Sequence, residues 1–309
     1  MDVIKTSLIF AIAITLYYLL LQWPVNTIEE PYIEEIANQS MDLNDSEQLL
    51  SETLAPLSSS SKIEPVAKTD ESSYFEIQND DLSLLIDSRT GRFFASQLKN
   101  ISETKGSEEG FMVLGRTYNA DSGGENIYFA NSGFYTRTQG YLDPDFSKIS
   151  ELNSSEGTMT YLLEGSGNGM TFSRRIEVQK NGYAIDVEDK VSSSLDEDIV
   201  ITPYVVIERD ASTVEESGLM YTYLGPVFSS SKDTYEKYDF DDIKEASYQN
   251  KSSGGWVALI QHYFLSAWVP DQANEYLYQG RYGENSGRYS LGYTSKDLIV
   301  SYGGSISAK

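Results

Sequence analysis

The chain has 309 residues, of which 47 are acidic and 23 are basic, so its formal net charge is −24. A charge of this sign and size repels nucleic acid and anionic lipid headgroups, which excludes DNA- and RNA-binding classes of function. The chain has no cysteine, and this excludes a disulfide framework and thiolate metal sites.

The first element is an apolar segment at Ser7–Trp23, with no charged residue between Lys5 and Glu29. At about 1.5 Å per residue this segment just spans a roughly 30 Å hydrocarbon core, so residues 1–23 are predicted to form a transmembrane anchor. Lys5 precedes the segment and acidic residues follow it, which places the N-terminus in the cytoplasm and the bulk of the chain outside. The alternative is a cleaved signal peptide, but Gln22-Trp23-Pro24 does not resemble a small-x-small cleavage site.

Residues 24–70 are predicted to be an acidic, flexible linker. They include ten acidic residues against Lys62 and Lys68, and four prolines are scattered among them. Few aromatic residues and a high like charge mean that such a segment cannot bury enough apolar surface to fold.

Residues 71–309 are predicted to form an all-β domain, a sandwich of antiparallel sheets. Short runs rich in Val, Ile, Tyr, Phe and Thr alternate with turn-forming residues about every 8–12 positions, as all-β domains do. Asn181-Gly182 predicts a hairpin turn because both residues accept a positive φ. Pro203 lies within an apolar run and predicts a sheet edge or a bulge there. The expected strands are Tyr74–Gln78, Leu82–Asp87, Phe111–Gly115, Ile127–Ala130, Thr158–Glu164, Thr171–Gln179, Ala184–Ser192, Ile199–Glu208, Gly255–Ile260, Tyr263–Val269 and Arg288–Tyr293.

The segment Gly254–Pro270 is ambiguous between helix and strand. Its aromatic and aliphatic residues fall at helical spacing, but they also fit two strands folded back at Gln261-His262. Dense aromatic and β-branched residues favour the hairpin.

No motif with specific reaction chemistry is present in the sequence. His262 is the sole histidine, so multi-histidine metal sites are excluded, and its place beside a predicted turn favours a solvent-facing role over a Ser-His-Asp triad. The run Asp239-Phe240-Asp241-Asp242 lacks the glycine and closing glutamate of a calcium loop. Gly165–Gly169 has no lysine where a phosphate-binding loop needs one, and it is interpreted as a loop between strands. These features predict a binding or structural domain that is not an enzyme and needs no cofactor.

Three successive motifs resemble the periplasmic domain of the YidC family of bacterial membrane protein insertases. They are Tyr235-Glu236-Lys237-Tyr238-Asp239-Phe240-Asp241-Asp242-Ile243, Ser253-Gly254-Gly255-Trp256-Val257-Ala258, and Tyr263-Phe264 with Ala267-Trp268-Val269-Pro270-Asp271. Leu84–Leu98, with Thr90-Gly91 in place of a paired glycine, resembles the family's first strand pair. Thr171–Val191 resembles a central strand pair, so the resemblance covers nearly the whole chain.

The resemblance implies a β-supersandwich related to mutarotase-like folds, without cofactor or metal. It implies a protein of the bacterial inner membrane that inserts and helps fold other membrane proteins, alone or with the Sec translocon, and that contacts lipid through residues 7–23. The family's insertase core lies in later helices, so the chain ending at Lys309 is expected to be the N-terminal part of a longer protein. A region overlapping Tyr221–Trp256 is the expected counterpart of the contact with Sec auxiliary subunits, with Glu236, Asp239, Asp241 and Asp242 as candidate contact residues.

A second hypothesis remains open, in which the chain is a membrane-anchored periplasmic protein that binds or modifies carbohydrate. It requires a concave face with stacked aromatic rings and convergent carboxylates. Glycan binding with Trp256 or Trp268 exposed would support this hypothesis, whereas further hydrophobic segments encoded beyond codon 309 would support the insertase.

Overall fold

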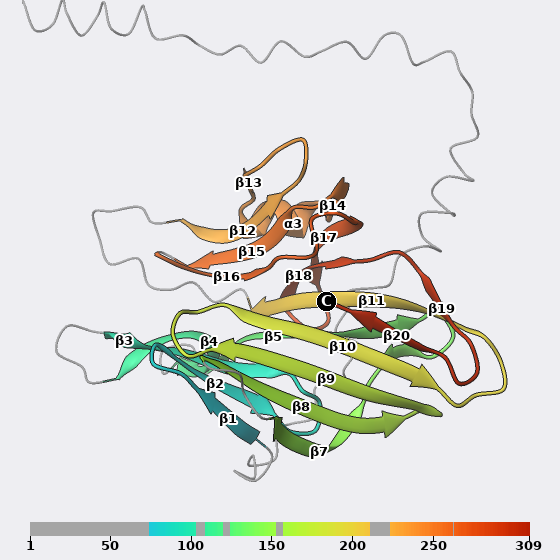
Figure 1. Ribbon diagram of the computed structural model, residues 1–309. Helices are drawn as coiled ribbons and strands as arrows, with labels where there is room; N and C mark the ends of the chain where they lie inside the picture. The colour runs from blue at the N-terminus through green and yellow to red at the C-terminus, as the bar shows by residue number, and fades with distance from the viewer. Residues whose placement is uncertain (1–73, 103–108, 120–123, 153–156, 211–222, 262) are drawn as a thin grey trace, which may run out of the picture. The chain divides into compact units, whose positions relative to one another are not determined.

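The computed structural model describes residues 74–309 except 103–108, 120–123, 153–156, 211–222 and 262 (Figure 1). The predicted anchor, the linker and His262 therefore lie outside the described residues. The strands of the first half of the domain are β1 (Tyr74–Gln78), β2 (Leu82–Asp87), β3 (Phe93–Ser102), β4 (Gly110–Asn119), β5 (Gly124–Thr136), β6 (Gly140–Leu142), β7 (Asp145–Leu152), β8 (Thr158–Gly167), β9 (Met170–Gln179) and β10 (Ile185–Ser193). The remaining elements are β11 (Ile199–Asp210), β12 (Leu224–Ser229), β13 (Glu236–Lys237), α3 (Phe240–Glu245), β14 (Tyr248–Ser253), β15 (Trp256–Gln261), β16 (Phe264–Trp268), β17 (Glu275–Gly283), β18 (Arg288–Thr294), β19 (Leu298–Val300) and β20 (Ser305–Ala308).

The strands form three antiparallel sheets, so the predicted all-β sandwich is confirmed. The large sheet has eleven strands and runs β1-β2-β3-β4-β5-β11-β18-β17-β14, with β6 beside β5 and β19 beside β11. The five-stranded sheet runs β20-β10-β9-β8-β7, and the four-stranded sheet runs β13-β12-β15-β16. Within the described residues α3 is the only α-helix, and no described helix has the length and apolarity to cross a membrane.

One core joins all three sheets. It combines Ile207 and Leu291 of the large sheet, Phe172 and Ile176 of the five-stranded sheet, and Leu259 of the four-stranded sheet, all of them buried. In β9 the alternation is strict, since residues of even number from Met170 to Val178 are buried and their neighbours are more exposed. This period of two is the pattern of a strand with one face on a core.

All eleven expected strands are found, and the second half of the domain contains most of the strands that were not expected. Gly254–Pro270 folds as the hairpin β15–β16, so the strand interpretation of this segment is confirmed. The resemblance also placed the β2–β3 and β9–β10 pairs correctly. The sequence patterns missed the short or polar strands β6, β7, β13, β14, β19 and β20, the longer strands β12 and β17, and helix α3. They also missed β3, which only the resemblance indicated.

The turn chemistry differs in detail from the expectation. The hairpin at Asn181-Gly182 exists, but of its two residues only Gly182 has a positive φ, at 93°. The tight turn lies instead at Asn168-Gly169 between β8 and β9, where φ is 53° and 74°. Two consecutive left-handed residues match the right-handed twist of the paired strands.

The prediction that Pro203 marks a sheet edge or a bulge is wrong, because β11 pairs on both sides and its register with β5 does not shift at Pro203. Pro203 lies in β11, which pairs with β5 on one side and with β18 and β19 on the other. On that second side, β19 pairs with Ile199–Ile201 and β18 pairs from Tyr204 onward. Pro203 falls at this change of partner, and its carbonyl accepts a hydrogen bond from Ser295 at 3.0 Å. A proline is tolerated in an interior strand here because no ladder bond needs its missing N–H.

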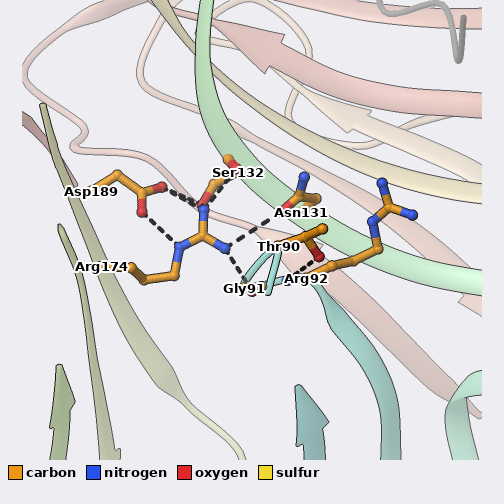
Figure 2. Close-up of polar contacts among 7 residues, drawn as sticks. All are labelled: Thr90, Gly91, Arg92, Asn131, Ser132, Arg174 and Asp189. Atoms are coloured by element: carbon orange, nitrogen blue, oxygen red, sulfur yellow. Dashed lines mark hydrogen bonds and ion pairs between the residues drawn. The ribbon is translucent and has the colours of Figure 1, made fainter. Parts of the chain in front are cut away.

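A buried arginine connects the five-stranded sheet to the large sheet (Figure 2). Arg174 is 2 % exposed and lies opposite Asp189 on the neighbouring strand β10. Its Nε donates to Asp189 Oδ1 at 2.6 Å and its Nη2 to Asp189 Oδ2 at 2.9 Å. Across the sandwich, Arg174 also donates to the carbonyl oxygens of Ser132 at 2.7 Å and Gly91 at 2.6 Å. This bidentate fork satisfies a buried charge pair and fixes the two layers against each other.

Candidate docking surface

The three motifs of the sequence meet in the four-stranded sheet and in the loops around it (Figure 1). On β15 and β16, the residues Val257, Leu259, Phe264 and Trp268 belong to the inner side, which packs on the large sheet. The residues that alternate with these along each strand lie on the other side of the same sheet, as the cross-strand pair Ile260 and Leu265 does. We call this second side the outer face.

Strand β16 carries an exposed apolar strip on the outer face. Leu265 is 56 % exposed, Val269 just after the strand is 64 % exposed, and Tyr263 just before it is 79 % exposed. Ala267 between them is also exposed. Four outward side chains in a row along one edge strand make this strip a candidate for contact with a partner.

The inward residues of β16 explain why this strand holds its position. Phe264 stacks on Phe111 of β4 with ring centroids 4.2 Å apart. Trp268 packs on Phe93 and donates its indole N–H to the carbonyl oxygen of Val206 at 3.1 Å. Both motif residues are therefore anchors of the sheet, and only their outward neighbours are free to meet a partner.

A lysine between aromatic rings continues the outer face toward β13. Lys237 Nζ lies 4.7 Å from the ring centre of Tyr223 and 5.4 Å from that of Tyr235. Tyr235 is 52 % exposed, and its ring lies 6.0 Å from the half-buried ring of Trp256. Cation–π contacts of this kind hold a charged side chain over an aromatic surface.

The predicted contact residues of the acidic run follow β13, at the edge of the four-stranded sheet opposite β16, and they divide into two groups. Asp239, Asp241 and Asp242 are exposed around the first turn of α3, where the Asp242 carboxylate accepts the Asp239 N–H at 2.9 Å. Acidic residues in the first turn suit the helix dipole. Glu236 is half-buried, and its carboxylate accepts a hydrogen bond from the Tyr248 hydroxyl at 2.9 Å, so it also has a structural role. Among the described residues no three acidic or histidine side chains are grouped to hold a metal ion.

Tyr238 and Phe240, two motif aromatics, pack inward instead. Tyr238 contacts the buried ring of Tyr248, which is itself stacked on Phe228 with centroids 3.9 Å apart. Burial raises the pKa of the Tyr248 phenol, so this ring remains a neutral donor to its partner carboxylate. Phe240 lies against Tyr289 of β18 at 4.6 Å. These contacts attach β13 and α3 to the large sheet.

The paired glycines form the joint between the large sheet and the four-stranded sheet. Gly254 and Gly255 have φ of 64° and 99°, and a Cβ on Gly255 would lie 2.2 Å from the Ser229 carbonyl oxygen. Tyr278 donates its hydroxyl to the Gly254 carbonyl at 2.8 Å. Glycine is required at Gly255 because both the left-handed backbone and the close approach exclude a side chain.

Gln272 closes this joint, and no sequence motif pointed to it. Its side-chain amide accepts the Gly255 N–H at 2.9 Å and donates to the Gly255 carbonyl at 3.0 Å. It also donates to the carbonyl of buried Pro270 at 2.7 Å. By bonding both the N–H and the carbonyl of Gly255, the Gln272 amide makes the two hydrogen bonds that the backbone of a paired strand would otherwise make.

A family model described as the YidC periplasmic domain matches residues 75–309 of this chain. The chain belongs to the YidC periplasmic domain family. The membrane protein insertase YidC of Actinobacillus succinogenes is 30% identical over 297 residues, which cover 93% of this chain and 51% of that protein. The insertase YidC of Cellvibrio japonicus is 26% identical over 98% of this chain and 56% of its own length. The chain thus spans about half the length of these YidC relatives.

Solved structures with a similar arrangement of strands carry other names. A galactose mutarotase-related enzyme from Lactobacillus acidophilus covers 76% of this chain and 95% of its own, with a TM-score of 0.46 and 11% identity. A GH36 α-galactosidase from Geobacillus stearothermophilus covers 76% of this chain and 39% of its own, with a TM-score of 0.49 and 6% identity. At such low identity, no role for a residue of this YidC-family domain follows from them.

Proposed function

We propose that this chain is the N-terminal part of a membrane protein insertase and that its β domain is a docking and scaffold domain in the periplasm. Residues 1–23 anchor it in the inner membrane with the N-terminus in the cytoplasm, and residues 24–70 link the anchor to the domain. The family membership and the relatives' shared name support this assignment. An insertase lowers the free energy of moving polar groups into hydrocarbon, which needs neither a nucleotide nor a metal.

The partner that we propose for the outer face is an auxiliary subunit of the Sec translocon. The observations that support it are the exposed apolar strip Tyr263–Val269 along edge strand β16 and the exposed acidic run Asp239–Asp242, the acidic border, which follows β13 at the opposite edge of the same sheet. An apolar centre with a charged rim is the usual anatomy of a protein interface. The acidic border would select a partner with basic residues at the matching positions, which is how charge complementarity gives specificity.

The sharpest test changes the strip and the border separately in the intact protein. Leu265→Lys is expected to reduce co-purification of Sec subunits from solubilised membranes at least tenfold, because a charge would be placed in the interface centre. Asp241→Lys is expected to give a smaller, salt-dependent loss, since a rim charge acts mainly through association rate. The measurement is the amount of Sec subunits that a tagged full-length protein retains, at low and at high salt.

Matched controls exist elsewhere on the domain. Ile299→Lys changes an aliphatic residue that is 63 % exposed, and Asp186→Lys reverses an exposed charge on β10. Both should leave co-purification unchanged. Unchanged Sec co-purification in both Leu265→Lys and Asp241→Lys would contradict the docking proposal while leaving the family membership intact.

A further inference from the structure

Strand β16 has an open edge. It is the last strand of the four-stranded sheet, and among the described strands it pairs only with β15 (Figure 1). Beyond that ladder, no backbone hydrogen bond from another described segment reaches residues 263–269. An edge strand of this kind presents a row of unpaired N–H and C=O groups, which is a template for pairing with another chain.

The register shows which backbone groups point to the open side. Gln261 and Phe264 are paired and two residues separate them, so they close a two-residue hairpin and exchange ladder hydrogen bonds. Hydrogen-bonded and non-hydrogen-bonded pairs alternate along an antiparallel ladder. Ser266 therefore bonds to β15, whereas Leu265 and Ala267 direct their N–H and C=O groups to the open side.

Strand β16 lacks the features that protect the other edge strands. Natural proteins protect sheet edges with charged side chains, with proline or with very short strands. At the other ends of the three sheets, β1, β7, β13 and β14 each contain a charged residue, and β20 exposes only serines. The sequence of β16 is Phe-Leu-Ser-Ala-Trp, with neither charge nor proline, and its exposed residues are Leu265 and Ala267.

The open edge is accessible, and the strand is already held in place. Leu265 is 56 % exposed on the outer face. On the inner side, the contact of Phe264 with Phe111 and the hydrogen bond from Trp268 to the Val206 carbonyl fix the strand on the large sheet. A strand that is ordered before a partner arrives loses less conformational entropy on binding.

We propose that β16 binds the docking partner by strand addition, in which an extended segment of the partner pairs with this open edge and extends the four-stranded sheet. The inference rests on the docking function proposed above and specifies how that contact is made. Backbone hydrogen bonds from Leu265 and Ala267 supply affinity. Cross-strand contacts with the same two side chains select a segment that has apolar residues at alternate positions.

The charge of the chain favours a different protein over a second copy as the occupant. With a formal net charge of −24 on each copy, two copies repel each other as they approach. Exposed Asp271 lies just beyond the strand, so the charge near this edge is also negative. The segment that fits is therefore apolar at alternate positions and carries lysine or arginine at its end beside Asp271.

The first test substitutes Ala267 in the full-length protein. Ala267→Pro removes the open N–H and places a ring where the added strand would lie, so the amount of Sec subunits that the tagged protein retains should fall about tenfold. Ala267→Ser keeps the N–H and a small side chain, and it should retain the same amount as the unchanged protein. Circular dichroism and urea unfolding verify that both variants are folded.

Hydrogen exchange of the unchanged full-length protein is a second measurement that needs no substitution. In the free protein, the N–H groups of Leu265 and Ala267 should exchange faster than that of Ser266, because Ser266 is bonded to β15. Purified Sec auxiliary subunits should slow exchange at Leu265 and Ala267 by about tenfold or more, since strand pairing protects backbone amides. Contact with the side chains alone would leave these rates unchanged.

The outcomes separate strand addition from docking. If Sec subunits bind without protecting Leu265 and Ala267, or bind Ala267→Pro as well as the unchanged protein, strand addition is wrong and the docking proposal stands. Protection that appears without Sec subunits and rises with protein concentration would show that a second copy occupies the edge. If the unchanged protein retains no Sec subunits, the docking proposal fails, and strand addition by that partner fails with it.

Discussion

Replacing Arg174 with methionine is expected to lower the free energy of unfolding by about 3–5 kcal/mol, the usual effect of breaking a buried ion pair by removing one partner. The change leaves Asp189 as an uncompensated buried carboxylate and leaves the carbonyls of Ser132 and Gly91 without their donor. Urea unfolding of the full-length protein, followed by tryptophan fluorescence, measures the loss.

The neighbouring residue provides the control for this experiment. Arg175 lies on the same strand with its side chain 48 % exposed and pairs with Glu177. Arg175→Met should cost less than about 1 kcal/mol, as exposed pairs do. The double change Arg174→Met with Asp189→Leu should recover much of the loss, because it removes the buried charge that the single change leaves unpaired. Equal losses in Arg174→Met and Arg175→Met would contradict the role assigned to the inter-sheet pair.

The second large effect is expected at Gly255. Gly255→Ala should lower the free energy of unfolding by about 2–4 kcal/mol, since it combines left-handed backbone strain with a steric clash. The clash is with the backbone carbonyl of Ser229, which cannot rotate away as a side chain can. Movement of this strand would also disturb the outer face, so the docking proposal predicts that Sec co-purification falls together with stability.

Gly182→Ala is the control that measures the backbone strain without a steric clash. It has a φ of 93°, close to that of Gly255, and a Cβ there would meet no atom within 4 Å. Gly182→Ala should therefore cost only the backbone strain, about 1–2 kcal/mol. If Gly255→Ala is no more destabilising than Gly182→Ala, the close approach to Ser229 is not what requires glycine.

Local patterns were sufficient for the strands that alternate and lie in hairpins. β9 and the β15–β16 hairpin were predictable because side chains in a strand alternate between faces and turns follow residue chemistry. The strands that the patterns missed are mainly short or polar, such as β13 and β14, and they exist because a neighbouring strand offers hydrogen bonds. Such pairing energy is absent from the sequence of the strand itself.

The residues of the candidate sites were also only partly predictable from the sequence. The motif residues were visible in the sequence, but their spacing did not distinguish the anchor Trp268 from the exposed Leu265 three residues away on the same strand. Gln272 carried no signal, because a glutamine in a loop is ordinary until a backbone group lies opposite it. The open edge of β16 is not visible in the sequence of the hairpin either, because it depends on β15 pairing with β12 on its other side.

The sequence by itself determined the sign of the charge, the β class, the main hairpins and the family resemblance, since each rests on composition or on short-range alternation. It also indicated a buried charge at Arg174, because this residue occupies a position where the alternation of β9 places apolar side chains. Only the tertiary structure decided that Ser132 and Gly91 complete this arginine's hydrogen bonds, and which motif aromatics face inward. The reason is physical: alternation fixes which side of a strand a residue occupies, whereas its partners depend on how distant strands pair and pack.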